Sequence, residues 1–277
     1  MLFLLTNKCN NNCIICQFKG KKRQESFIAK NVIVRKVREN DNVALKTISF
    51  GGGEPTLHKD FFKIIADTSC MRPNIEIAIL TNGRMFAYND FTAQFSRLDI
   101  KRIKFIIPLH GHKDSIHDNV TQIEGSFLNT VLGIKNLLNI GAILELRVII
   151  NKINYQYLNE ISYFIFNTFP EFTYLVFISM EINNRAISRE APVPYEQFVP
   201  YLEEVLKKYD TTRIKLYHFP LCSINDNHWH LIYKSIDKKK LCFSKECGRC
   251  FVKKNCMGIL KSYSAYFGNK NFNPITR

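Results

Sequence analysis

The sequence predicts an α/β fold: a partial (β/α)6 barrel of the TIM type, followed by a small cysteine-rich C-terminal extension. Three observations support this prediction. Apolar runs of strand length alternate with segments of helical periodicity, polar motifs follow the ends of these runs, and most cysteines gather near the two ends of the chain. Strands that alternate with helices form parallel sheets, and parallel barrels hold their active sites at the carboxyl ends of the strands.

Six apolar runs are expected to be strands, and the segments between them are expected to be helices. The expected strands are residues 2–5, 47–50, 75–80, 104–109, 143–150 and 174–180. The clearest helices are expected at residues 59–67 and 126–139, and Gly141 supplies a stop signal for the second. Right-handed crossovers then return every strand to one parallel sheet.

The pattern changes after residue 180. A polar stretch with prolines precedes an expected helix at residues 195–209 and an expected short strand at residues 213–217, and the cysteine-rich end follows. We therefore expect a barrel over residues 1–185 and an extension over residues 186–277. The extension looks too small for a core of its own, so a bound metal would help it to fold.

Composition narrows the class of protein. The chain has 277 residues and is 46% hydrophobic, which indicates a globular protein, and no apolar run reaches the roughly 18 residues of a membrane span. We expect no signal peptide and no membrane association, and cysteines in short-spaced sets indicate metal ligands in a reducing cytoplasm. The net charge of +15 favours acidic partners, although solvated lysine faces explain it equally well.

Cys9, Cys13 and Cys16 form a C-x3-C-x2-C set directly after the first expected strand. Three thiolates can hold three irons of a four-iron cluster and leave the fourth iron open to a ligand. The alternative is a zinc site that joins Cys13 and Cys16 to a distant cysteine pair. Cys70 stands alone and is expected to be a small buried apolar side chain.

A glycine-rich set, Gly51, Gly52, Gly53 and Glu54, follows the second expected strand. Adjacent glycines let a ligand approach the backbone closely, and a carboxylate accepts hydrogen bonds from a cationic amine. The set therefore suits the α-amino group of an amino acid. Its spacing matches neither a dinucleotide fingerprint nor a Walker loop, and a tight turn without a ligand is the alternative.

Later strands carry weaker signals. His110, His112 and His117 follow the fourth expected strand and are expected to be loop or surface residues. Glu145 and Arg147 are two residues apart on the fifth strand, so they share a face. If this face points into the barrel, Arg147 can meet a cofactor carboxylate. The alternative is an Arg–Glu pair that satisfies itself.

The first cysteine set and the Gly-Gly-Glu turn together resemble those of the radical S-adenosylmethionine (SAM) superfamily, in the same order and after the same strands. The resemblance implies a [4Fe–4S] cluster on the three cysteines, with SAM chelated to its open iron. The residues implied or proposed to contact SAM are Ile15, Gly52, Gly53, Glu54, Asn82 and Arg147. Ile15 departs from the aromatic residue that this family usually has beside the adenine.

The resemblance also implies a reaction. The cluster takes an electron from a donor such as flavodoxin or ferredoxin and cleaves SAM to methionine and a 5′-deoxyadenosyl radical, which abstracts a hydrogen from a substrate. The sequence assigns no separate catalytic side chain, because the cofactors carry this chemistry.

Cys247, Cys250 and Cys256 form a C-x2-C-x5-C set near the end of the chain, with Cys222 and Cys242 upstream. This pattern resembles the auxiliary-cluster (SPASM/twitch-like) extension of peptide-modifying members of the superfamily. The resemblance implies a second [4Fe–4S] cluster on Cys222, Cys247, Cys250 and Cys256, which leaves Cys242 spare. A zinc ribbon with four cysteine ligands is the alternative.

Across the middle strands and the tail, the chain resembles the His-Xaa-Ser system radical SAM maturase. This likeness implies a post-translational maturase that modifies a ribosomally made peptide or protein. The basic run at residues 19–23 would suit an acidic peptide. Two alternatives stay open: a radical SAM enzyme that acts on a nucleic acid or a small metabolite, with nucleic acid the less favoured partner, and a non-catalytic zinc-binding interaction protein.

Overall fold

A computed structural model describes residues 1–17, 27–40, 42, 45–182 and 191–276 of the chain. Eight strands form one sheet in sequence order, and every neighbouring pair is parallel. These strands are β1 (Leu2–Thr6), β2 (Thr47–Gly52), β3 (Glu76–Leu80), β4 (Ile103–Pro108), β5 (Ile143–Ile150), β6 (Tyr174–Ser179), β7 (Ile214–Tyr217) and β8 (Ile232–Tyr233).

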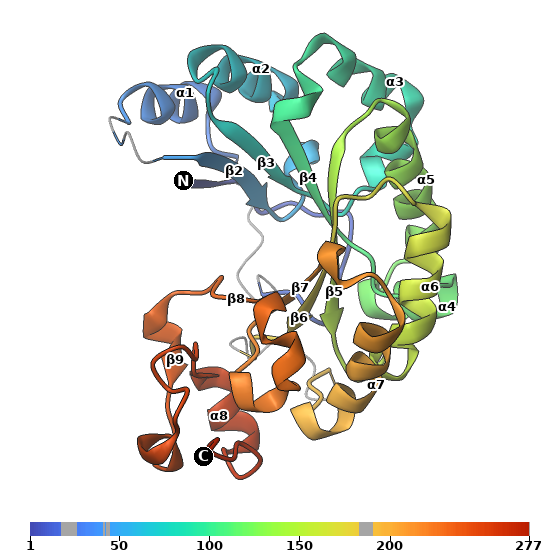
Figure 1. Cartoon of the computed structure of the whole chain (residues 1–277). Coiled ribbons are helices and arrows are strands. Elements are labelled where there is room, and N and C mark those ends of the chain that lie inside the picture. The colour runs from blue at the N-terminus through green and yellow to red at the C-terminus, as the bar shows by residue number, and fades with distance from the viewer. Residues whose placement is uncertain (18–26, 41, 43–44, 183–190, 277) are drawn as a thin grey trace.

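Helices cover the outside of this curved sheet, as Figure 1 shows. They are α1 (Lys30–Arg38), α2 (Phe61–Met71), α3 (Asn89–Ala93), α4 (Asp114–Thr121), α5 (Ser126–Asn139), α6 (Leu158–Thr168) and α7 (Tyr195–Lys208). The architecture confirms the predicted α/β fold with its parallel, partial barrel. None of the described helices is both long and apolar enough to cross a membrane.

The sheet is longer than the six predicted strands. All six are present, and β5 has the predicted bounds, but β7 and β8 continue the same sheet through the pairs Leu175 with Ile214 and Leu216 with Ile232. Strand β7 falls within residues 186–277, which were predicted to form the extension. The boundary predicted between residues 185 and 186 and the basic run at residues 19–23 lie outside the described residues.

Strand alternation divides the side chains between two environments. On β5, Leu144, Leu146 and Val148 are fully buried and belong to the main core between sheet and helices. Glu145 and Arg147 point to the opposite, concave face. The concave face is therefore where a polar site has room, while the convex face provides stability through apolar burial.

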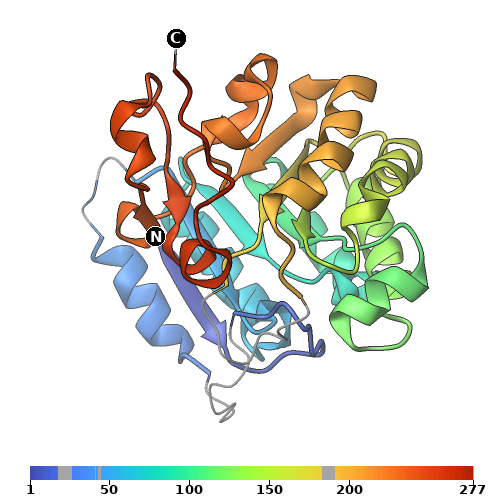
Figure 2. The same cartoon turned by 90° about the horizontal axis from the view of Figure 1, so that it is seen from below.

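The C-terminal segment carries the second cysteine set. Its two-residue strands β9 (Leu241–Cys242) and β10 (Ile259–Leu260) pair antiparallel, and α8 (Lys261–Phe267) follows. Tyr263 on α8 anchors the segment, because its hydroxyl accepts a hydrogen bond from the Tyr195 amide at 3.1 Å and the two rings lie 4.9 Å apart. Figure 1 and Figure 2 both show this segment on the side away from α4 and α5.

Candidate functional site

The first cysteine set lies on the loop after β1, at the carboxyl ends of the strands, as predicted. Helix α4 holds this loop through backbone hydrogen bonds. The amide of Asn12 donates to the Thr121 carbonyl, and the amide of Ile14 donates to the Val120 carbonyl, both at 2.9 Å. These carbonyls lie in the last turn of α4, where they have no partner within the helix. The loop and the helix end therefore satisfy each other.

The three thiols of this loop interact with one another. Burial, together with the neighbouring Cys9 and Cys16, raises the pKa of Cys13 to about 12. The amide of Asn11 donates to the Cys9 sulfur at 3.4 Å. A bound metal deprotonates coordinating thiols and supplies the positive charge that three adjacent thiolates need. The donor set is therefore suited to an iron–sulfur cluster, although the structure describes the thiols alone.

The glycines after β2 are required by the chain that passes over them. A Cβ atom on Gly52, whose φ is +131°, would lie 2.4 Å from the Thr6 carbonyl oxygen, and one on Gly53 would lie 2.2 Å from that of Lys8. The Gly53 amide also donates to the Thr6 carbonyl at 2.7 Å. The turn and the cysteine loop thus pack backbone to backbone, which only glycine permits.

Glu54 connects two strand-end turns. Its side chain is fully buried, and it accepts hydrogen bonds from the Thr56 backbone amide (3.1 Å) and hydroxyl (2.6 Å), from the Thr81 hydroxyl (2.6 Å) and from the Asn82 backbone amide (2.7 Å). Burial raises the pKa of this carboxyl, and the four donors oppose that effect. Glu54 therefore ties the turn after β2 to the turn after β3, and its contact with an amine stays a prediction.

Asn82 and Arg84 extend this connection to the cysteine loop. The side-chain Nδ2 of Asn82 donates a hydrogen bond to the side-chain oxygen of Asn10 at 2.6 Å. The Arg84 guanidinium donates to the Asn10 carbonyl and, at 2.9 Å, to the Asn11 side-chain oxygen. Asn82 therefore lies beside the cysteine loop, and its contact with a cofactor stays a prediction. Arg84 was not predicted from the sequence. Its position directly after the Asn82-Gly83 turn was the only feature that pointed to a role at this site.

Ile15 packs against α4 on the cysteine loop. Its side chain is 6% exposed and lies in a small apolar cluster with Val120, Met180 and Ala191. This cluster adds apolar contacts to the backbone hydrogen bonds that join the loop to α4. Contact between Ile15 and the adenine of a cofactor stays a prediction.

Arg147 forms the self-satisfied pair that was the alternative to cofactor contact. Its Nε and one terminal nitrogen lie 2.7 Å and 2.6 Å from the same carboxylate oxygen of Glu145. The guanidinium also lies 5.6 Å from the centre of the Tyr217 ring. Contact between Arg147 and a cofactor stays a prediction, since its side chain is 23% exposed on the concave face.

Two histidines after β4 are buried rather than at the surface. His110 and His117 are 2% and 1% exposed, and the His110 amide donates to His117 Nδ1 at 3.1 Å. His110 Nδ1 and His117 Nε2 are buried with no hydrogen-bond partner among the described residues. His110 lies in the loop after β4, as expected, and His117 lies on α4, but both side chains are buried, so neither is a surface histidine.

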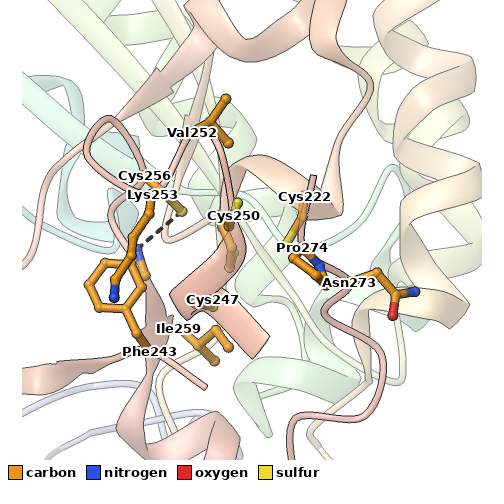
Figure 3. A pocket seen from close by; sticks show the side chains of 12 residues that line it. Cys222, Phe243, Cys247, Cys250, Val252, Lys253, Cys256, Ile259, Asn273 and Pro274 are labelled. Carbon is orange, nitrogen blue, oxygen red and sulfur yellow. Dashed lines mark hydrogen bonds between the residues drawn. The ribbon is translucent and has the colours of Figure 1, made fainter. Parts of the chain in front are cut away.

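The second cysteine site lies in the C-terminal segment, and Figure 3 shows its side chains around one pocket. Burial, together with the nearby Cys256, Cys247 and Cys250, raises the pKa of Cys222 to about 12. The pocket is lined by Cys222, Cys247, Cys250 and Cys256, the four cysteines implied as ligands, and Cys242 on β9 is not among its lining residues. Cys70 on α2 is exposed, so its predicted burial was wrong.

Backbone amides and a hydroxyl group lie beside two of the sulfur atoms of this site. The amides of Leu221 and Gly258 donate to the Cys256 sulfur at 3.4 Å and 3.3 Å, and the Ser244 hydroxyl lies 3.4 Å from the Cys247 sulfur. Such bonds stabilise thiolates and tune a cluster. Within the described part of the chain, no group of three or more His, Cys, Asp or Glu side chains is arranged so that it could hold a metal ion. A tetrahedral zinc site would bring all four sulfurs to about 2.3 Å from one ion.

Comparisons with known proteins support these observations. The family model described as "Radical SAM superfamily" matches residues 3–164. The chain is 29% identical over 137 residues to a probable GTP 3′,8-cyclase of Methanocella arvoryzae, which covers 50% of this chain and 42% of that protein. A probable GTP 3′,8-cyclase of Saccharolobus islandicus is 24% identical over 151 residues, 54% of this chain and 47% of that protein. The chain thus spans about half the length of these curated relatives.

Solved structures share the fold at low sequence identity. Streptococcus suis SuiB bound to the precursor peptide SuiA has a TM-score of 0.64 and 14% identity, over 78% of this chain and 48% of that one. The protein anSMEcpe with bound AdoMet and a peptide has a TM-score of 0.60 and 15% identity, over 74% of this chain and 58% of that one. These likenesses extend beyond the residues that the family model matches.

Proposed function

The chain belongs to the radical SAM superfamily, whose enzymes use a [4Fe–4S] cluster and SAM, and from this premise we propose that it modifies a peptide or protein and carries a second cluster. When bound, the first cluster supplies the electron that cleaves SAM to methionine and a 5′-deoxyadenosyl radical, which abstracts a hydrogen from the substrate. Cys9, Cys13 and Cys16 are the proposed ligands of that cluster.

The residues around these cysteines position and shield the cofactors. The end of α4 and Arg84 hold the cysteine loop from two sides. Glu54 fixes the turn that carries Gly52 and Gly53, and the backbone of this turn is the proposed contact of the SAM amine. The apolar cluster around Ile15 excludes water from the adjacent space. No side chain of the set needs to exchange a proton for this role.

The second cysteine site is the observation that carries the proposal of a two-cluster enzyme. Four cysteines line one pocket, and amide or hydroxyl groups lie within 3.4 Å of the sulfurs of Cys247 and Cys256. An iron–sulfur cluster accounts for four thiols and for these hydrogen bonds. We assign Cys222, Cys247, Cys250 and Cys256 as its ligands.

A peptide or protein substrate is supported by three features together. They are the second cysteine site, the fold shared with two proteins that were solved with bound peptides, and the chain's charge of +15, which favours an acidic substrate. The second candidate is a phosphate-bearing nucleotide. It is favoured by the relatives named probable GTP 3′,8-cyclase, which match half of this chain.

Anaerobic reconstitution tests the cofactor assignment. About eight irons per chain, and 5′-deoxyadenosine formed only with a reductant, are expected for two four-iron clusters. The Cys13→Ala variant should form no 5′-deoxyadenosine, and Cys222→Ala should retain about four irons. Cys70→Ala is the matched control, because Cys70 is exposed on α2 and lies outside both sites. Bound zinc without 5′-deoxyadenosine would refute the proposal.

The substrate class is tested by turnover with defined probes. Short peptides encoded beside the gene, GTP and a short RNA are each incubated with the reconstituted enzyme, and modified products are detected by mass spectrometry. A mass change in a peptide supports the first candidate, and a change in GTP supports the second. RNA affinity that falls steeply with salt, without any peptide product, would count against a maturase.

A further inference from the structure

The concave face of the sheet carries a row of charged side chains that have no role in the mechanism proposed for SAM cleavage. The Arg147 guanidinium lies 2.6 Å from the Glu145 carboxylate. The Lys104 ammonium lies 3.1 Å from the Glu76 carboxylate and 4.0 Å from that of Glu145. Two cations therefore face two carboxylates across β3, β4 and β5, and their charges balance.

Lys215 on β7 is a third cation on this face. Its Nζ lies 3.3 Å from the centre of the Tyr174 ring and 5.0 Å from that of Tyr233. No ion pair within 4.0 Å joins it to a carboxylate of the described residues. Burial lowers the pKa of Lys215, although the charges of Glu145 and Glu76 oppose this change. Among the described residues of the concave face, Lys215 is thus a third cation beside two carboxylates, without an ion pair of its own and partly withdrawn from water.

The surroundings of Lys215 are aromatic and open at one edge. Tyr217 and Tyr233 are paired across β7 and β8, and their ring centres lie 6.1 Å apart. Tyr233 is 45% exposed, so this edge of the sheet is in contact with solvent. Tyrosine rings attract a cation through their faces, and tyrosine hydroxyls donate hydrogen bonds to anions.

The concave face at the other end of the sheet is apolar. Leu2 and Leu4 on β1 are 58% and 38% exposed. A Cβ atom on Gly51 would lie 3.9 Å from a Leu2 methyl and 3.5 Å from the Cβ of Leu80, which places these three residues on the same face. A substrate across the sheet would therefore meet leucines at one end and an unpaired ammonium among tyrosines at the other.

We propose that Lys215, together with Tyr174 and Tyr233, binds an anionic group of the substrate, a carboxylate or a phosphate. An anion here supplies the missing counter-charge, and a partly desolvated site strengthens the resulting hydrogen bond. The proposal rests on the proposed function and deepens it, because it names the chemistry that the substrate must carry. If Lys215 only packs on the Tyr174 ring, the site has no preference for anions.

Paired probes that differ in the presence of an anionic group test this subsite. One pair is a pentapeptide with a central glutamate and the same peptide with glutamine, and the other is GTP and guanosine. Binding to the reconstituted enzyme with SAM is measured by calorimetry. The acidic member of at least one pair should bind about tenfold more tightly than its neutral partner, the value of one charge-assisted hydrogen bond. The pair that responds tells a carboxylate from a phosphate.

Variants at Lys215 connect the preference to this side chain. Lys215→Met should bring the acid-to-neutral affinity ratio close to one, and Lys215→Arg should keep most of it. Lys135→Met on the exposed side of α5 is the control and should leave the ratio unchanged. The ratio is taken within each variant, so partial loss of folded protein cancels.

The outcomes separate the two proposals. No charge preference in either pair, or a preference that persists in Lys215→Met, would overturn the subsite. Formation of 5′-deoxyadenosine by the unsubstituted enzyme without substrate reports the proposed function independently. A chain that cleaves SAM but shows no charge preference therefore contradicts the subsite alone.

Discussion

At the scale of single residues, close backbone packing explains the glycines after β2. We expect Gly53→Ala to displace the cysteine loop, because the new Cβ would lie 2.2 Å from the Lys8 carbonyl oxygen and backbone cannot yield as a side chain does. The variant should lose most of its 5′-deoxyadenosine formation and up to about four irons. Both are measured after anaerobic reconstitution.

Gly248 offers the matched control for this substitution. It neighbours Cys247, but nothing lies within 4 Å of a Cβ at this position, and its φ is not in the left-handed region. Gly248→Ala should therefore keep its irons and its activity. Full activity in Gly53→Ala would show that the cysteine loop does not need its packing on this turn.

The buried histidines make stability depend on pH. Burial and the Arg84 charge lower the pKa of His117 to about 3, and burial lowers that of His110 well below its usual value. Below about pH 6.5 these histidines bind protons in the unfolded chain but not in the folded chain. The free energy of unfolding therefore falls as the pH falls from about 6.5 towards 3. From pH 7.5 to 5.5, each such histidine should reduce the free energy of unfolding by about 1.4 kcal/mol.

Urea unfolding at these two pH values measures the effect. His117→Asn should show the smaller loss, because asparagine keeps an acceptor near the position of Nδ1 and has no proton to gain. His230→Asn, at an exposed position, should behave as the unsubstituted chain does. An equal loss in His117→Asn would mean that His117 is not the group that titrates.

Residue types in a motif were predictable, but their partners were not. Short spacing and the position after a strand predicted the set Cys9, Cys13 and Cys16, and the resemblance to auxiliary-cluster extensions implied that Cys222 joins Cys247, Cys250 and Cys256. The sequence could not show that Thr56, Thr81 and the Asn82 amide would occupy Glu54, since these contacts join two separate strands. Nor could it show that a histidine loop folds inward, because burial there depends on α4.

At the scale of elements, one carboxylate joins the ends of β2 and β3. Glu54→Gln keeps the shape of this side chain but places an NH2 group where hydroxyl and amide donors converge. We expect a loss of about 2 kcal/mol in the free energy of unfolding, the cost of unpaired buried donors. SAM should also bind more weakly, because Asn82 and the glycine turn lose a shared support. Urea unfolding and equilibrium dialysis with SAM measure the two effects.

Glu204→Gln controls for the change in charge, since Glu204 is exposed on α7. It should leave both quantities unchanged. If Glu54→Gln were equally neutral, the carboxylate would have no part in holding the two turns together.

Element length decided which parts of the fold were predictable. Strand β5 has eight residues with clear apolar alternation, and its predicted and observed bounds agree. Strand β8 has two residues, Ile232 and Tyr233, and no periodicity can appear in so short a run. Its place in the sheet depends on tertiary pairing with β7, which local sequence does not encode.

At the scale of the whole molecule, the two cysteine sites differ in their structural support. The first is held by the sheet, by α4 and by two strand-end turns. The second is surrounded by short elements, β9 and β10 of two residues each, and residues 243–256 are mostly exposed. We therefore expect a segment with so little buried apolar surface to depend on a metal centre for its order.

Metal removal should therefore loosen the C-terminal segment before the barrel. We expect amides of residues 244–256 to exchange hydrogen much faster after chelation of the irons, while β4 and β5, whose core side chains are fully buried, stay protected. Hydrogen exchange with mass spectrometry compares the reconstituted and chelated enzyme. Cys222→Ala should reproduce the change in this segment without chelation, because it removes one ligand only there. Equal protection in all three samples would show that Tyr263 and its neighbours hold the segment without metal.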